Sequence, residues 1–103
     1  MNYKELVENF AKNPRDVSTK PITNRPGKWF YVYVKNEKII VDVARQHEPK
    51  CSIRQPRTLS EKEIDDIYEL YIKRIQGFAV SKQAASITMN QVYWYGIFND
   101  MEV

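Results

Sequence analysis

The stretch KWFYVYVKNEKIIVDVAR, residues 28–45, carries the strongest structural signal in the chain. Residues 29–34 and 39–43 consist almost entirely of β-branched and aromatic types, which favour extended backbone. Asn36 and Glu37 interrupt the run, and a two-residue connection of this kind joins the two strands of a β-hairpin. The sequence therefore predicts an antiparallel hairpin that turns at these two residues.

The turn also determines which residues share a face of the hairpin. On one face every side chain is apolar, which predicts that this face covers the core. Its pairs are Val34 with Ile39, Val32 with Val41, and Phe30 with Val43. The other face mixes aromatic rings with charge, and we expect it to be only half covered. It carries Trp29, Tyr31, Tyr33 and Lys35 opposite Lys38, Ile40, Asp42 and Ala44.

Upstream of the hairpin, residues 3–12 have apolar side chains at helical spacing and predict a short helix. The pair Asn13-Pro14 ends this helix, because proline disfavours helical geometry in the residue before it. Residues 15–27 combine polar residues with proline and glycine. We expect a loop or an irregular edge segment there, partly extended over residues 20–24.

Downstream of the hairpin, residues 45–57 are polar and basic. Cys51 and Ile53 alternate with polar residues in this segment, which makes them a candidate third strand of the sheet. Ser60 and Glu63 then have the spacing of a capping box, in which each side chain satisfies a free N–H group of the first helical turn. A long helix is therefore predicted from this point.

Two shorter helices are predicted after the long one. Gly77 is placed to end the long helix in a left-handed conformation, with Phe78 folding back onto the last turn. Ser81 can cap a helix over residues 82–87, and Asn90 can cap another over residues 91–98. The chain thus has a helical C-terminal half.

The length of 103 residues suits a single domain, residues 1–103. We predict an α+β fold with an N-terminal helix, an antiparallel hairpin or three-stranded sheet, and a three-helix C-terminal half. Cys51 is the lone cysteine, so an internal disulfide is excluded and a cysteine-based zinc site lacks ligands. No segment has the pattern of a secretion signal or a membrane span. We therefore expect a cytoplasmic protein without membrane contact, metal or cofactor.

Basic residues are concentrated in the first part of the chain. Residues 1–58 contain twelve Lys/Arg and six Asp/Glu, a net charge of +6, whereas residues 59–103 contain four and seven, a net charge of −3. Attraction to phosphate is therefore expected mainly from the N-terminal half. The candidate contacts in this half are Lys28, Lys35, Lys38, Arg45, Lys50, Arg54 and Arg57.

An aromatic stripe, Trp29, Tyr31 and Tyr33, lies beside these cations in the predicted hairpin. Rings flanked by cations suit a single-stranded nucleic acid, because bases stack on the rings while phosphates pair with the cations. The alternative is that the rings pack under the N-terminal segment or a helix, with the lysines only solvating the tip of the hairpin.

Residues 80–100, together with the preceding long helix, resemble a helix-turn-helix motif. Ala84 occupies the position of a small residue at the helix crossing, Ile87 and Met89 bracket the turn, and Trp94 and Ile97 are the inward residues of the second helix. In this family the second helix enters the major groove and its first residues touch base edges. The resemblance implies such contacts from Asn90, Gln91 and Tyr93. The alternative is an ordinary structural packing unit.

These features lead to a small nucleic-acid-binding regulatory or accessory protein as the first functional hypothesis. The alternative is a protein-interaction module, such as a small inhibitor or adaptor of the kind that phages and mobile elements encode. Its partner would be another protein or a second copy of the chain. The aromatic residues near the C-terminus, Trp94, Tyr95 and Phe98, motivate this alternative, because aromatic side chains dominate interface hot spots.

An enzyme is the least supported hypothesis. His47 and Cys51 are the only candidates for a base and a nucleophile, and Pro49 between them breaks the helical spacing that would bring them together. No catalytic residues are therefore predicted.

Overall fold

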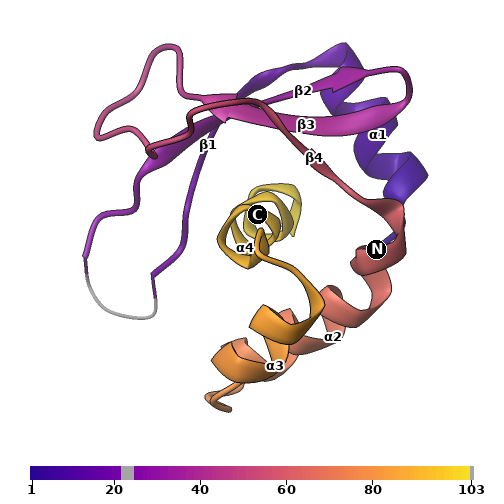
Figure 1. Cartoon of the computed structure of the whole chain (residues 1–103), viewed down its shortest axis with the longest axis vertical. Coiled ribbons are helices and arrows are strands. Elements are labelled where there is room, and N and C mark those ends of the chain that lie inside the picture. The colour runs from indigo at the N-terminus through magenta and orange to yellow at the C-terminus, as the bar shows by residue number, and fades with distance from the viewer. Residues whose placement is uncertain (22–24, 103) are drawn as a thin grey trace.

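The structure of the chain, a computed structural model, describes residues 1–21 and 25–102. It consists of a four-stranded antiparallel sheet with helices packed against one of its faces (Figure 1). The strands lie in sequence order across the sheet. They are β1 (Arg15–Ser18), β2 (Trp29–Lys35), β3 (Lys38–Val43) and β4 (Arg57–Leu59).

The predicted hairpin is confirmed in its register and in its turn. Strands β2 and β3 pair Val34 with Ile39, Val32 with Val41, and Phe30 with Val43. Asn36 and Glu37 have φ angles of 53° and 62°. Positive φ at both central residues is typical of the tight turn whose twist matches that of the flanking strands.

The two flanking strands lie elsewhere than predicted. Residues 15–18, expected to be a loop or irregular edge, form β1. Part of the predicted extension over residues 20–24 falls on residues 22–24, outside the described residues. Cys51 and Ile53 are not a strand: the chain returns there beside the start of β2, beyond the end of β3, so only Lys50 forms a single bridge to Trp29. The strand paired to β3 is instead β4.

The helices are α1 (Tyr3–Lys12), the 3-10 turn η1 (Glu61–Glu63), α2 (Ile64–Ile75), α3 (Ser81–Ile87) and α4 (Gln91–Glu102). Helix α2 ends as predicted at Gly77, whose φ is 96°. The N–H of Gly77 donates to the carbonyl of Arg74, and that of Phe78 donates to the carbonyl of Lys73, which satisfies two terminal carbonyls. The Phe78 side chain does not fold back, because it is 62% exposed.

The predicted cap of α3 differs from the observed one, whereas Asn90 stands at the predicted position directly before α4 but does not cap it with its side chain. Ser81 is the first residue of α3 rather than its cap, a position that Val80 occupies. The Asn90 side chain accepts a hydrogen bond from Arg57, while its backbone carbonyl accepts from the N–H groups of Tyr93 and Trp94. Helix α4 also extends to Glu102, four residues beyond the predicted end.

Helix α4 is the centre of the fold (Figure 1). Trp94, Ile97 and Phe98 are fully buried between the sheet, α1 and α2. Gly96 allows α4 to lie close to β1, because a Cβ there would be 2.7 Å from the carbonyl oxygen of Ser18. Across residues 1–21 and 25–102, no helix combines the length and apolar composition that a membrane span needs.

Candidate nucleic-acid interface

The two faces of the sheet have different environments. Along β2, Phe30 and Val32 are fully buried on the side that packs against α1 and α4, which we call the inner face. The alternate residues Trp29, Tyr31 and Tyr33 point to the other side, the outer face, and are half-buried. The helices therefore do not cover the aromatic stripe.

The side chains of the outer face cover one another. The rings of Tyr31 and Tyr33 have their centroids 5.8 Å apart and are tilted by 32°. Across the strands, Tyr33 is paired with Ile40, and Tyr31 with Asp42. Ile40 is only 8% exposed yet lies outside the main core cluster, which shows that this face has its own small apolar layer.

The loop after β3 folds back over the outer face and places two flat side chains on the stripe. The guanidinium carbon of Arg45 lies 4.0 Å from the centroid of the Tyr31 ring. The imidazole of His47 stacks on Trp29 with centroids 4.0 Å apart and planes 18° apart. Contacts of this kind between cations or aromatic groups and a ring face are favourable.

Asp16 of β1 holds this loop in position. Its side chain is 2% exposed and accepts from the backbone N–H groups of Arg45, Gln46 and His47 at 2.9, 2.7 and 3.0 Å. The imidazole Nδ1 of His47 lies 2.9 Å from the same carboxylate. Burial alone raises the pKa of the Asp16 carboxyl, but the hydrogen bonds from Arg45, His47 and Gln46 together hold it below its ordinary value of 3.8.

Sequence reasoning missed Asp16 because it lies in a four-residue strand and its partners are 29 to 31 positions away. No local pattern marks such a contact. The only signal available is that Asp16 and Ser18 flank the apolar Val17, which is too short an alternation to identify a strand.

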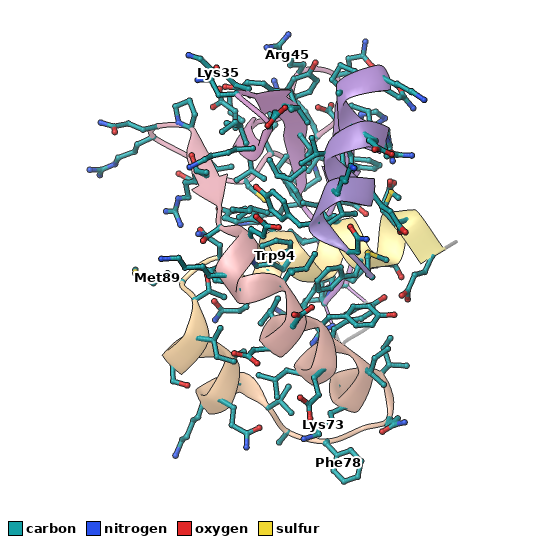
Figure 2. All side chains as sticks on the ribbon, turned by 90° about the vertical axis from the view of Figure 1, so that its right-hand side faces the viewer. Lys35, Arg45, Lys73, Phe78, Met89 and Trp94 are labelled. Carbon is teal, nitrogen blue, oxygen red and sulfur yellow. The ribbon has the colours of Figure 1, made fainter. Side chains whose placement is uncertain are left out.

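Three of the seven predicted cations flank the aromatic stripe. Arg45 covers Tyr31, while Lys35 and Lys38 are paired and exposed at the turn end of the hairpin, on the same face as Tyr33. Figure 2 shows Lys35 and Arg45 together at one end of the molecule, with Lys73 and Phe78 at the opposite end.

Two of the other four cations, Arg57 and Lys28, lie on the helical side, so the seven candidate contacts do not form a single cluster. Arg57 faces the helices: its Nη1 donates to Asn90 Oδ1 at 3.1 Å, and its guanidinium lies 5.7 Å from the Tyr93 ring. Lys28 lies at a pocket on the helical side. Lys50 and Arg54 are exposed in the loop before β4, where Lys50 forms the bridge to Trp29 at one end of the aromatic stripe.

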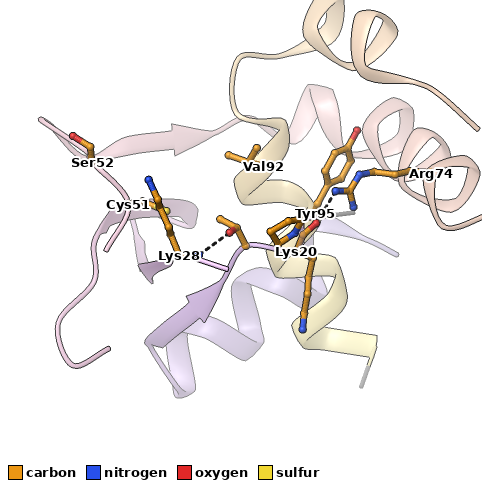
Figure 3. Close-up of a pocket in the computed structure, with 9 residues that line it drawn as sticks. Lys20, Lys28, Cys51, Ser52, Arg74, Val92 and Tyr95 are labelled. Carbon is orange, nitrogen blue, oxygen red and sulfur yellow. Dashed lines mark hydrogen bonds between the residues drawn. The ribbon is translucent and has the colours of Figure 1, made fainter. Parts of the chain in front are cut away.

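The pocket beside Lys28 has a volume of about 370 Å³ (Figure 3). Arg74 crosses it, donating to the carbonyl of Lys20 at 2.6 Å and lying 4.7 Å from the Tyr95 ring. The ammonium groups of Lys20 and Lys28 extend in different directions. The lining thiol, Cys51, is buried, which raises its pKa although Lys28 lowers it in part. A buried thiol of this kind is a poor nucleophile.

The residues implied by the helix-turn-helix resemblance are not placed to read a groove. Tyr93 is buried against Phe30, with ring centroids 5.1 Å apart. The amide of half-buried Gln91 faces the carbonyls of Thr88 and Met89 at 2.8 and 3.3 Å. The residues of α4 from Tyr93 to Phe98 are all buried, so this part of the helix presents no exposed face.

The inward residues of the motif are placed as the resemblance implies, with the exception of one turn residue. Ala84, Trp94 and Ile97 are fully buried. Met89, one of the two residues that bracket the turn, is 84% exposed. A core helix and a recognition helix share the same inward pattern, so the sequence did not distinguish them. Ala84, Trp94 and Ile97 of this unit belong to the same core cluster as Phe30 and Val32 of the sheet.

The Asp16–His47 pair has the geometry that orients an imidazole in hydrolase triads. Here, however, the ring lies flat on Trp29, and in the described part of the chain it hydrogen-bonds to no serine hydroxyl or cysteine thiol. The described residues also hold no group of three potential metal ligands. The arrangement positions a flat ring at the surface rather than a base next to a nucleophile.

Comparisons with protein-family models, with curated proteins and with solved structures find no match to this chain. Its functional interpretation therefore rests on the geometry described above.

Proposed function

We propose that this protein binds single-stranded nucleic acid across the outer face of its sheet, as a regulatory or accessory protein. The observation that supports this most directly is the aromatic stripe, which no helix covers in the described structure and which Arg45, Lys35 and Lys38 flank. Because the lone cysteine requires no oxidising compartment, we propose a cytoplasmic location.

The chemistry of this face favours a single strand over a duplex. Aromatic rings along a sheet stack on the flat faces of bases. In a duplex these faces are not accessible, because the bases stack on one another. Base stacking on aromatic side chains contributes roughly 1–3 kcal/mol per base. The lysines at the hairpin end and Arg45 then supply charges for the phosphates between the stacked bases.

One residue of the outer face opposes this interaction. Asp42 lies across from Tyr31, and its carboxylate accepts from the N–H of Val43. Its charge disfavours a phosphate at the centre of the face, so the strand is expected to keep its bases over the rings and its phosphates toward Arg45 and the lysines.

The test is a fluorescence-anisotropy titration of labelled single-stranded DNA and RNA at low salt. Tyr33→Ala should weaken binding by about 5- to 150-fold, the equivalent of ~1–3 kcal/mol. Phe78→Ala removes an exposed ring at the other end of the molecule and should leave binding unchanged. No binding by the wild-type protein, or equal losses in both variants, would reject the proposal.

The charge contribution is tested by salt dependence with a matched pair of lysines. Lys35→Ala should reduce the slope of log affinity against log salt by about one unit or slightly less. Lys73→Ala removes a lysine of α2 at the opposite end and should leave the slope unchanged. Equal slopes for both variants and the wild type would contradict a role for the hairpin end.

A protein-interaction module is the second candidate, but the aromatic residues that first suggested it are not at the surface. Trp94, Tyr95 and Phe98 are buried within the protein. Exposed apolar side chains lie instead around the end of α2 and the start of α4, at Ile75, Phe78 and Val92. For this candidate we propose self-association through these residues. Light scattering should then show a concentration-dependent dimer that Phe78→Ser abolishes, whereas a monomer at all concentrations would exclude it.

A further inference from the structure

Two rings of the outer face already carry a flat side chain on their exposed sides. His47 lies on Trp29 and Arg45 lies on Tyr31, both at 4.0 Å, whereas Tyr33 has no stacking partner beyond Tyr31 among the described residues. A base arriving at the first two rings must therefore either displace these groups or stack on top of them.

The position of Asp16 favours stacking on top. One buried carboxylate accepts from three consecutive backbone N–H groups and contacts the His47 imidazole, so this segment of the loop is anchored. Displacing the imidazole would break a hydrogen bond to a carboxylate and a ring stack, and the base would recover only the stack. Hydrogen bonds to charged groups are stronger than neutral ones, so this exchange is unfavourable.

The outward sides of both groups remain available. The His47 side chain is 46% exposed although one face of its ring lies on Trp29. Arg45 is exposed in the same loop. Imidazole rings and guanidinium planes both serve as stacking surfaces for unpaired bases.

We infer that His47, Arg45 and Tyr33 form three adjacent stacking positions for the bases of one single strand, and that Asp16 is the positioning residue for the first two. This inference rests on the proposed function and names its ligand as a strand of at least three nucleotides with unstacked bases. The rings beneath belong to residues 29, 31 and 33 of one strand, so they follow one another along its outer face, and the Tyr31 and Tyr33 centroids are 5.8 Å apart.

The direction in which His47→Ala changes the affinity shows whether a base stacks on His47 or displaces it from Trp29. If His47 is a stacking surface, His47→Ala lowers the affinity for single-stranded oligonucleotides, by about 5-fold or more on the scale of other aromatic contacts. If His47 is a cover, the same variant raises the affinity because a competitor for Trp29 is removed. His47→Phe keeps a ring at the position and should lie closer to wild type than His47→Ala.

At Arg45, a substitution by lysine distinguishes the contribution of base stacking to the affinity from that of positive charge. Arg45→Lys keeps the positive charge but loses the guanidinium plane. We expect it to lose most of the affinity that Arg45→Ala loses. Full retention of affinity by Arg45→Lys would show that Arg45 contributes only charge, which would overturn the inference for this position.

Asp16→Asn tests the positioning role. An amide keeps one acceptor oxygen but cannot accept at both carboxylate positions, so the loop should loosen and affinity should fall toward that of His47→Ala. Trp29 fluorescence provides a readout besides binding, because the only other tryptophan, Trp94, is fully buried. The emission of Asp16→Asn should shift toward that of His47→Ala. Unchanged emission would overturn the positioning role.

The length of the ligand completes the test. With oligo-dT or oligo-U of one to eight nucleotides, the affinity of the wild type should rise steeply up to three nucleotides and slowly beyond. Higher or unchanged affinity in His47→Ala, with Tyr33→Ala still impaired, would overturn this inference and leave the proposed function in place. Absence of wild-type binding would overturn both. Denaturation curves identify any variant that fails to fold. If His47→Ala or Arg45→Ala does not fold, the affinities of the conservative variants His47→Phe and Arg45→Lys are used instead.

Discussion

The two faces of the sheet are made by the same strands and have opposite properties. On the inner face, Phe30, Val32 and Val41 are completely buried among α1 and α4. On the outer face, Tyr31 and Tyr33 are half-buried and share their surface with Arg45 and the lysines of the turn. The inner face is what folding requires. The outer face keeps aromatic rings at a half-exposed surface, and this is the face for which we propose binding.

The largest expected effect distinguishes the faces by stability. Phe30→Ala should lower the free energy of unfolding by ~3–5 kcal/mol, because it leaves a cavity against α4. Tyr33→Ala removes a ring of similar size from the outer face and should cost about 1 kcal/mol or less on the scale of a cross-strand pair. Urea denaturation measures both. Similar losses would mean that the outer face belongs to the core.

The next effect concerns the close contact between α4 and the sheet. Gly96→Ala should destabilise the protein by ~1–3 kcal/mol, because the added methyl group meets the Ser18 backbone at 2.7 Å and the Phe30 ring at 3.0 Å. Gly77→Ala is the matched control, since its Cβ would meet no atom within 4 Å but its φ of 96° is strained, at about 1 kcal/mol. A smaller loss at Gly96 than at Gly77, by thermal or urea unfolding, would contradict this packing.

A pH-dependent effect sharpens the comparison on the outer face. The folded state holds the pKa of Asp16 below 3.8, so it binds fewer protons there than the unfolded state. The resulting stability is complete above pH 3.8 and is lost as the pH falls through the lower folded-state pKa. Asp16→Asn should therefore be less stable than wild type at pH 7, by ~1–3 kcal/mol.

The measurement is the free energy of unfolding of both proteins from pH 7 to pH 2.5. The difference between them should narrow as the pH falls below the ordinary value of 3.8 for Asp16. The other acidic residues titrate in both proteins and cancel in the difference. If the two curves stay parallel over this range, the carboxyl group of Asp16 does not contribute to the pH dependence of stability.

The smallest expected effect is on the side of the helices. Arg57→Ala removes a cation that contacts Asn90 and Tyr93 instead of the aromatic stripe. Its loss should change the affinity for single strands by less than about 2-fold, since a distant exposed charge contributes little once salt screens it. Arg45→Ala serves as the comparison in the same anisotropy assay. Equal losses for the two arginines would mean that the strand also crosses the helical side.

The sequence predicted the parts of the fold that local patterns determine. The register of the hairpin follows from the alternation along residues 29–43 and from the two-residue turn, and Gly77 ends α2 because only glycine readily adopts its conformation. Strand β4 was misplaced because its three residues carry no alternation of their own. It is defined only by pairing with β3.

Only part of the candidate site could be selected from the sequence: Asp16 was missed, and His47 was not among the predicted contacts. The aromatic stripe and Arg45 could be selected by composition, whereas their contact depends on Asp16, which is remote in sequence. Arg57 was grouped with Arg45 because both lie in one basic segment. The strand alternation of β4 turns Arg57 toward Asn90, and that direction depends on where β4 begins.

The packing of α4 against β1 has a consequence for synthesis on the ribosome. The guanidinium of Arg15 donates two hydrogen bonds to the carboxylate of Asp100, 85 positions later. The β2–β3 hairpin leaves the ribosome before α4, the helix that covers its apolar face. This face is therefore exposed to water while the remaining residues are translated. Contacts between such distant segments slow folding and prolong the exposure of aggregation-prone strands. A nascent chain arrested before residue 91 should therefore be a substrate for chaperones that recognise extended apolar segments.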